Sequence, residues 1–414
     1  MKKSKKLTRR DFLRLSAITT AGLALWSMPG WLQAAAALSP SSRRKTLVVL
    51  FQRGAADGLN IVAPFVDPLY QKARPTIALG EPGSSNGVLD LDGHFGLHPH
   101  LSPLMPLWKN RQMAIVHSAG SPDGSRSHFD AQDNMETGTP GISTTPDGWL
   151  NRALRTFHEK SPNPLSAVAL TNRLPRILRG DYPVAAMNSA NSYDISMGSN
   201  SADDLESLYG GSMDSLLAAA GRQTGESLKR VKDLLKNAPA KSPFAQYTQS
   251  EFGQRFADLA KLIKAEAGLK VGFLDVGGWD HHYEEGSVNG YMGYVLNDFG
   301  PNLGAFFTDL GDKARDVVLV SMTEFGRTLN ENGAHGTDHG HGSVMFLIGA
   351  SVKGGKVYGK WPGLEPESLF EGRDLQVTTD FRQVYSEALA KHLGVEQLTG
   401  VFPSYKSSSH LGFL

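Results

Sequence analysis

Carboxylate and imidazole side chains gather in four segments of this 414-residue chain. The segments are Arg53–Asn60, Ser125–Asp130, Asp275–His282 and Glu324–Gly342, and each follows an apolar run. These side chains together are ligands that Zn, Mn and Fe accept in proteins, and a chain without cysteine offers no thiolate in their place. The pattern therefore predicts a divalent metal site, with a purely hydrogen-bonded polar network as the alternative.

The elements that would position these segments form a sheet buried between helices. Short apolar runs recur at Thr46–Phe51, Met113–His117, Ala167–Leu170, Val271–Asp275, Val317–Met322 and Val344–Ile348. Continuous apolar runs indicate strands buried on both faces, as in parallel sheets. Between them, residues such as Phe252, Phe256 and Leu259 recur at helical spacing. We predict a doubly wound α/β fold, with a mostly parallel sheet sandwiched by helices and functional groups beyond the carboxyl ends of the strands.

The N-terminus has the layout of an export signal. Arg9 and Arg10 are followed by Phe-Leu, the twin-arginine pattern, and the apolar run Leu15–Leu25 is too short to span a bilayer comfortably. We predict a removable twin-arginine signal peptide over residues 1–36, with an ordinary secretory signal or a basic tail as the alternative. The expected location is the periplasm, reached in the folded state and without a permanent membrane anchor.

Net charge and chain length limit the possible binding partners and the domain organisation. Because residues 1–36 carry seven basic and one acidic side chain, the 42 basic and 41 acidic residues become 35 and 40 after cleavage. No basic stripe then remains for nucleic acid. Residues 45–400 suit one large α/β domain or two ordinary domains. An insertion or cap is expected at about 175–245, where Asn188–Ser201 is rich in Asn, Ser and Gly.

The polar segments resemble, in the same order, the motifs of the domain-of-unknown-function family 1501. This is a set of twin-arginine-exported bacterial proteins related to the alkaline phosphatase/sulfatase superfamily. The matching segments are Arg53–Asn60, Ser125–Asp130, Gly277–His282, Thr323–Thr328 and Gly336–Gly342, and the resemblance covers about residues 45–400. It implies an alkaline-phosphatase-like fold. The family has no assigned activity, so its relation to the superfamily supplies the functional expectation.

That relation implies one or two divalent metal ions, a hydroxyl nucleophile and an anionic substrate. The implied metal ligands are Asp57, Asp280, His282 and one or both of His339 and His341, and the implied nucleophile is Ser127. Arg327 would neutralise a phosphate or sulfate oxygen, or would instead pair with Glu324. The chain departs from the superfamily at Glu324-Phe325, where Asp-His is usual. Glu324 can still ligate a metal but Phe325 cannot, which argues against a complete two-metal centre.

The leading functional hypothesis is a periplasmic, metal-dependent hydrolase of the phosphatase/sulfatase type, acting on a small anionic ester. The alternative is a non-catalytic binding or assembly protein on the same fold, with a degraded metal centre and a protein partner. Ser127 has a competing interpretation, because Ser127 and Asp130 match a capping box at the start of a helix. Ser125 or a metal-bound water is then the alternative nucleophile, and the role of His281 stays open.

Overall fold

The computed structural model describes residues 45–159, 163–188, 233–234, 236–406 and 409–414, and the structural statements below concern these residues. The predicted signal peptide, residues 1–36, lies outside them, as does most of the predicted insertion, at 189–232. Arg44–Phe157 and Pro164–Leu414 form one compact unit. No described helix is both long and apolar enough to cross a membrane.

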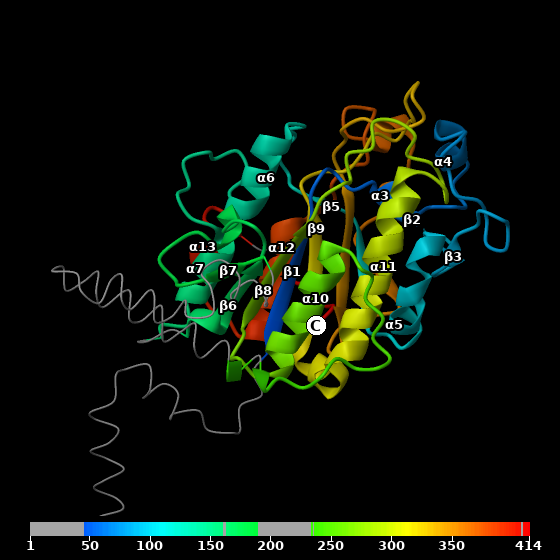
Figure 1. Cartoon of the computed structure of the whole chain (residues 1–414). Helices are drawn as coiled ribbons and strands as arrows, with labels where there is room; N and C mark the ends of the chain where they lie inside the picture. The colour runs from blue at the N-terminus through cyan, green and yellow to red at the C-terminus, as the bar shows by residue number, and fades with distance from the viewer. Residues whose placement is uncertain (1–44, 160–162, 189–232, 235, 407–408) are drawn as a thin grey trace, which may run out of the picture. The chain divides into compact units, whose positions relative to one another are not determined.

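A mixed sheet of nine strands forms the centre of the described unit (Figure 1). The strands are β1 (Thr46–Gln52), β5 (Met113–Gly120), β6 (Ala167–Leu170), β7 (Ala185–Met187), β8 (Val271–Val276), β9 (Val317–Thr323), β10 (Ser343–Gly349), β11 (Lys356–Tyr358) and β12 (Thr379–Asp380). Their order is β11-β5-β10-β9-β1-β8-β6-β7, with β12 also paired to β5. Only β10 among these runs antiparallel, because the loop from β9 returns at the same edge of the sheet. The prediction of a mostly parallel sheet is confirmed.

Helices cover both faces of this sheet, as the doubly wound prediction requires. The α-helices are α3 (Gly58–Ile61), α4 (Pro68–Ala73), α5 (Met105–Lys109), α6 (His128–Thr137), α7 (Trp149–Arg155), α10 (Glu251–Lys264), α11 (Tyr291–Leu310), α12 (Phe381–Glu387) and α13 (Leu398–Val401). Figure 1 shows α10 and α11 in front of the sheet and α12 behind it. The front core contains Phe256 and Phe299, and the rear core contains Trp149 and Tyr385, all buried.

Shorter elements complete the unit. Strands β2 (Val62–Ala63), β4 (Gly96–Leu97) and β3 (Leu89–Asp90) make a small antiparallel sheet. Short 3-10 helices are η1 (Pro99–Leu104), η2 (Pro164–Ser166), η3 (Arg176–Leu178), η5 (Gly311–Asp316) and η6 (Pro366–Ser368), and η7 (Ala388–Leu393) is a π-helix.

Strand register brings the polar segments to one edge of the sheet. In the parallel pairs of β1 with its neighbours, Gln52 is opposite both Val276 of β8 and Thr323 of β9. The three strands therefore end side by side, and β5 runs in the same direction because both β5 and β9 are antiparallel to β10. The loops that follow these strands leave from this carboxyl edge, where α/β folds place their functional groups.

Candidate metal centre

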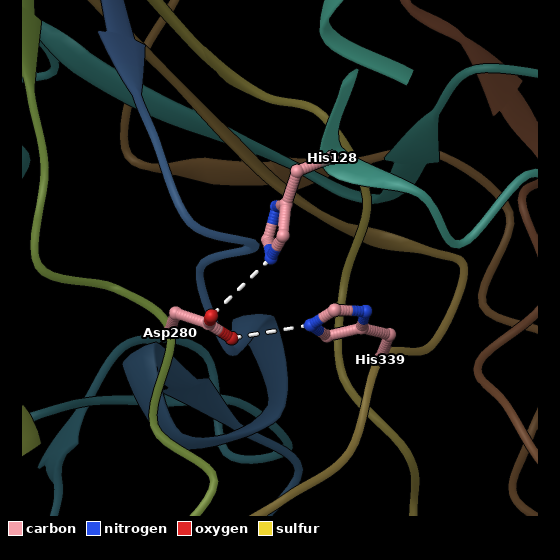
Figure 2. A group of neighbouring side chains, drawn as sticks. All are labelled: His128, Asp280 and His339. Atoms are coloured by element: carbon pink, nitrogen blue, oxygen red, sulfur yellow. Dashed lines mark hydrogen bonds and ion pairs between the residues drawn. The ribbon is translucent and has the colours of Figure 1, made fainter. Parts of the chain in front are cut away.

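Four ligand-type side chains meet at the carboxyl edge, and we name them the His/Asp cluster: His128, Asp280, His282 and His339. His128 begins α6, Asp280 and His282 lie in the loop after β8, and His339 precedes β10. Ligand atoms of His128, Asp280 and His339 lie within 4.8 Å of one another (Figure 2). His282 joins them, because its Nε2 atom is 3.1 Å from Asp280 Oδ1 and 3.0 Å from His339 Nε2.

Each histidine of the cluster is oriented through its Nδ1 atom. The contacts are to Glu324 Oε1 for His128 (2.8 Å), to Asp338 Oδ1 for His282 (3.1 Å) and to the Arg126 carbonyl oxygen for His339 (2.8 Å). Because carbonyl and carboxylate oxygens accept hydrogen bonds, these partners assign the ring proton to Nδ1 and leave a lone pair on Nε2. An outer oxygen that holds the far nitrogen of the ring is typical of metal-binding histidines.

The Nε2 atoms therefore face one another and the Asp280 carboxylate, which also accepts a hydrogen bond from Arg327 Nη2. Two lone pairs 3.0 Å apart, on His282 and His339, repel unless a proton or a metal ion lies between them. His128 Nε2 is buried, has no hydrogen-bond partner in the described part of the chain, and lies 3.4 Å from Asp280 Oδ2. Three imidazole nitrogens and a carboxylate are a suitable ligand set for Zn, Mn or Fe. The residues present thus fit a divalent metal ion.

Arg327 keeps the carboxylate of the cluster ionised. Its side chain is fully buried, and one Nη2 contact is to Asp280 Oδ1 at 2.5 Å. Burial raises the pKa of Asp280, but the hydrogen bond and charge of Arg327 outweigh it and lower the pKa to about 2. The remaining guanidinium contacts go to the carbonyl oxygens of Gly54, Ala55, Trp279 and Thr337. The structure thus pairs Arg327 with Asp280 rather than with Glu324, and its donors point into the protein.

Glu324 lies behind His128 rather than among the converging ligand atoms. Its buried Oε1 accepts hydrogen bonds from the Gly54 amide (2.9 Å) and from Gln132 Nε2 (2.9 Å), besides its contact with His128. Burial raises the pKa of Glu324, but the hydrogen bonds from His128 and Gln132 lower it overall, and the same contact with Glu324 raises the pKa of His128. Phe325 packs beside the rings of His128 and His339, with centroids 5.0 Å away in each case. It forms an apolar wall of the centre.

Asp57 belongs to a second, buried site, which we name the Asp57–Arg74–Glu285 network. The Asp57 carboxylate accepts hydrogen bonds from both terminal nitrogens of Arg74, and it caps α3 by accepting from the Leu59 amide. Burial raises the pKa of Asp57, but Arg74 lowers it overall. Burial and the charge of Asp57 raise the pKa of Glu285 well above its usual range, so Glu285 retains the proton of the pair. The structure does not bring Asp57 into the His/Asp cluster.

His341 and Ser127 also lie apart from the converging atoms. The His341 ring stacks on Phe370 with centroids 4.0 Å apart, and burial lowers its pKa. Ser127 is the N-cap of α6, where its hydroxyl accepts from the Asp130 amide at 3.5 Å. That contact is long for a hydrogen bond, so the hydroxyl is weakly held.

His128 is a ligand-type residue of the cluster that was not among the residues predicted from sequence. In Ser125–Asp130 a role was predicted for the hydroxyl groups, and none for the imidazole next to Ser127. A signal was present, since His128 lies in one of the four polar segments, and Glu324, its partner, was itself considered as a metal ligand. What the sequence lacks is the direction of each side chain at the start of α6.

Comparison with known proteins identifies a family. Residues 94–401 match the family described as protein of unknown function (DUF1501). No curated protein matches the sequence. Among solved structures, the chain is similar to the C-terminal periplasmic domain of EcEptC from Escherichia coli, at 9% identity over 89% of this chain and 90% of that one, with a TM-score of 0.41.

Two further solved structures are similar at the same low level of identity. A protein in the alkaline phosphatase superfamily from Vibrio parahaemolyticus is 11% identical over 76% of this chain and 62% of its own length, with a TM-score of 0.33. The lipoteichoic acid synthase LtaP from Listeria monocytogenes is 10% identical over 82% and 77%, with a TM-score of 0.33.

Proposed function

We propose that this chain, which belongs to the DUF1501 family of proteins of unknown function, is a metal-dependent hydrolase of phosphate or sulfate esters. One observation carries the proposal. Three imidazole Nε2 atoms and an ionised carboxylate converge, while every Nδ1 atom is already committed to an oxygen. A protein gains nothing from such mutually repelling acceptors unless a cation binds among them.

The arrangement also suits turnover rather than a sealed structural site. The side chains of the cluster are 23% to 46% exposed, so a small ester can reach them. A divalent ion held there would act as a Lewis acid on an ester oxygen and would help to generate a nucleophile at neutral pH. The chain's own residues contribute orientation: Arg327 holds Asp280, and Glu324 holds His128. Ser127, adjacent to His128, is the candidate nucleophile, with water as the alternative.

A second function is a non-catalytic, metal-binding assembly protein, and two observations favour it. Four protein ligands can complete a tetrahedral shell, which is characteristic of structural zinc sites. In addition, Arg327 has its donors directed at the protein, so it cannot neutralise a substrate without moving.

We also propose that the protein acts in the periplasm, after twin-arginine export directed by Arg9 and Arg10.

The first experiment measures metal content and turnover on the same samples. Protein isolated from the periplasmic fraction should hold about one divalent ion per chain by elemental analysis and should hydrolyse an aryl phosphate or an aryl sulfate. His128→Ala and His282→Ala should each lose the ion and the turnover. His335→Ala is the matched control, because His335 is an exposed loop histidine outside the cluster. Bound metal without turnover favours the assembly protein, and absence of metal overturns both functions.

A further inference from the structure

A buried carboxylate next to the cluster holds two arginines in place. Asp374 is fully buried, and its carboxylate accepts hydrogen bonds from Arg126 (3.0 and 2.6 Å) and from Arg373 (2.8 and 3.0 Å). Both arginines also contact His339. The Arg126 carbonyl accepts from His339 Nδ1 at 2.8 Å, and Arg373 Nη2 donates to the His339 carbonyl at 2.7 Å. Asp374 therefore fixes two guanidinium groups beside one residue of the metal centre.

Each of these guanidinium groups keeps donors that the protein does not use. The contacts of Arg126 and Arg373 engage only the Nε and Nη2 atoms, and within the described residues Nη1 has no partner in either side chain. The side chains are 28% and 43% exposed, so these donors are open to solvent. Arg327 differs, because its side chain is fully buried and bonded to protein oxygens. Unused guanidinium donors held in place by a buried carboxylate can bind a tetrahedral oxyanion through charge-assisted hydrogen bonds.

We propose that Arg126 and Arg373 form an oxyanion-binding pair, which takes the phosphate or sulfate group of the ester at the edge of the His/Asp cluster. The substrate role rests on the proposed function, whereas anion binding by the pair does not require the metal. The pair would thus neutralise the phosphate or sulfate oxygen, the role predicted from sequence for Arg327. Asp374 acts through the arginines as a positioning residue.

Glu371 competes with an incoming anion for this pair. Its carboxylate, 59% exposed, lies 2.7 Å from Arg126 Nη2. Exposed ion pairs contribute little free energy, so an oxyanion that contacts both arginines can displace this carboxylate. Removing its charge should therefore strengthen anion binding. A gain of affinity cannot result from misfolding, and this makes Glu371→Gln the most informative variant.

The experiment is calorimetric titration of metal-free and zinc-loaded protein with inorganic phosphate and, separately, with sulfate. Arg126→Gln and Arg373→Gln should each weaken phosphate binding about tenfold or more, as expected for the loss of a charge-assisted contact. Glu371→Gln should strengthen it severalfold. Arg315→Gln is the matched control, because Arg315 is an exposed arginine paired with Asp312 just after α11. Its affinity should equal that of the wild type.

The outcomes separate this inference from the metal proposal. If phosphate binds only the zinc-loaded protein and equally in all variants, the anion contacts the metal alone, and the arginine pair is overturned while the metal site stands. If wild-type protein binds neither anion in either form, the pair is likewise overturned. If zinc does not bind but phosphate binding depends on both arginines, the pair stands and the metal proposal fails.

Discussion

The His/Asp cluster and the Asp57–Arg74–Glu285 network use similar side chains at the same edge of the sheet. They differ in whether those side chains are fully paired within the protein. In the network, Asp57 accepts two hydrogen bonds from Arg74 and one from the Leu59 amide. Glu285 accepts from Asn60 and from Thr337. The Asp57 and Arg74 side chains are almost fully buried. Every charge there has a protein partner, so no ligand is needed.

The imidazole Nε2 atoms of the His/Asp cluster lack this internal satisfaction. These atoms face acceptors, and the side chains of the cluster are partly exposed. Residue type therefore does not separate a ligand site from a stability site. What separates them is whether a donor elsewhere in the chain reaches the group. Arg74 reaches Asp57, and no described donor reaches the His128 Nε2 atom.

The largest effect is expected when the network loses its only arginine. Arg74→Met leaves the Asp57 charge buried without compensation, so the free energy of unfolding should fall by about 3–5 kcal/mol. Chemical denaturation of the metal-free protein measures this. The control is Arg315→Met, which removes an exposed pair and should cost less than about 1 kcal/mol. Equal losses in the two variants would contradict the distinction between the two regions.

Two buried histidines extend the comparison, because both of their ring nitrogens have protein partners. The Nδ1 atom of His98 accepts a hydrogen bond from the His100 amide, and that of His117 accepts one from the Ser118 amide. The Nε2 atom of each ring contacts a main-chain carbonyl oxygen. Burial lowers the pKa of each to about 4. Between pH 6.5 and 4 the unfolded chain therefore binds more protons than the folded chain, and stability falls as the pH is lowered through this window.

Replacing one of these histidines tests that pH dependence. His117→Gln can still donate to the Val62 carbonyl but cannot titrate. The loss of unfolding free energy between pH 7 and pH 4.5 should therefore be smaller than in the wild type by about 2–3 kcal/mol. Denaturation of metal-free protein at the two pH values measures this difference. An unchanged pH dependence would show that His117 is not buried in its neutral form.

Glu324→Gln should act on metal affinity more than on stability. The amide still fills the space but loses the charge that holds His128 Nδ1, so zinc affinity should fall about 10–100-fold. Competition with a chromogenic chelator measures this affinity. His335→Ala again serves as the control. If Glu324→Gln binds zinc like the wild type, Glu324 does not orient a metal ligand.

The smallest expected change is in the stability of Ser127→Ala. Loss of the α6 cap should cost about 1 kcal/mol or less, because the contact with the Asp130 amide is long. If Ser127 is the nucleophile, aryl-ester turnover should also fall by several powers of ten while zinc affinity stays the same. Near-normal turnover would restrict Ser127 to capping and would leave water as the nucleophile.

Much of the fold could be predicted from local sequence. The runs Thr46–Phe51, Val271–Asp275 and Val317–Met322 lie in β1, β8 and β9, because continuous apolar residues need burial on both faces. The direction of β10 could not be predicted from its composition. It depends on a connection that stays at one edge of the sheet, and a buried strand has the same residues in either direction.

The family, the α/β architecture and the segments in which ligand-type residues gather follow from the amino-acid order, since they depend on local pattern and burial. Which of those residues face one another follows from the folded structure alone. Arg74, which lies outside the polar segments, forms an ion pair with Asp57. Asp374 orients two arginines beside His339. Such partners can be more than two hundred residues apart, as Arg126 and Asp374 are. Hydrogen bonds depend on direction and distance in space, which residue spacing along the chain does not encode.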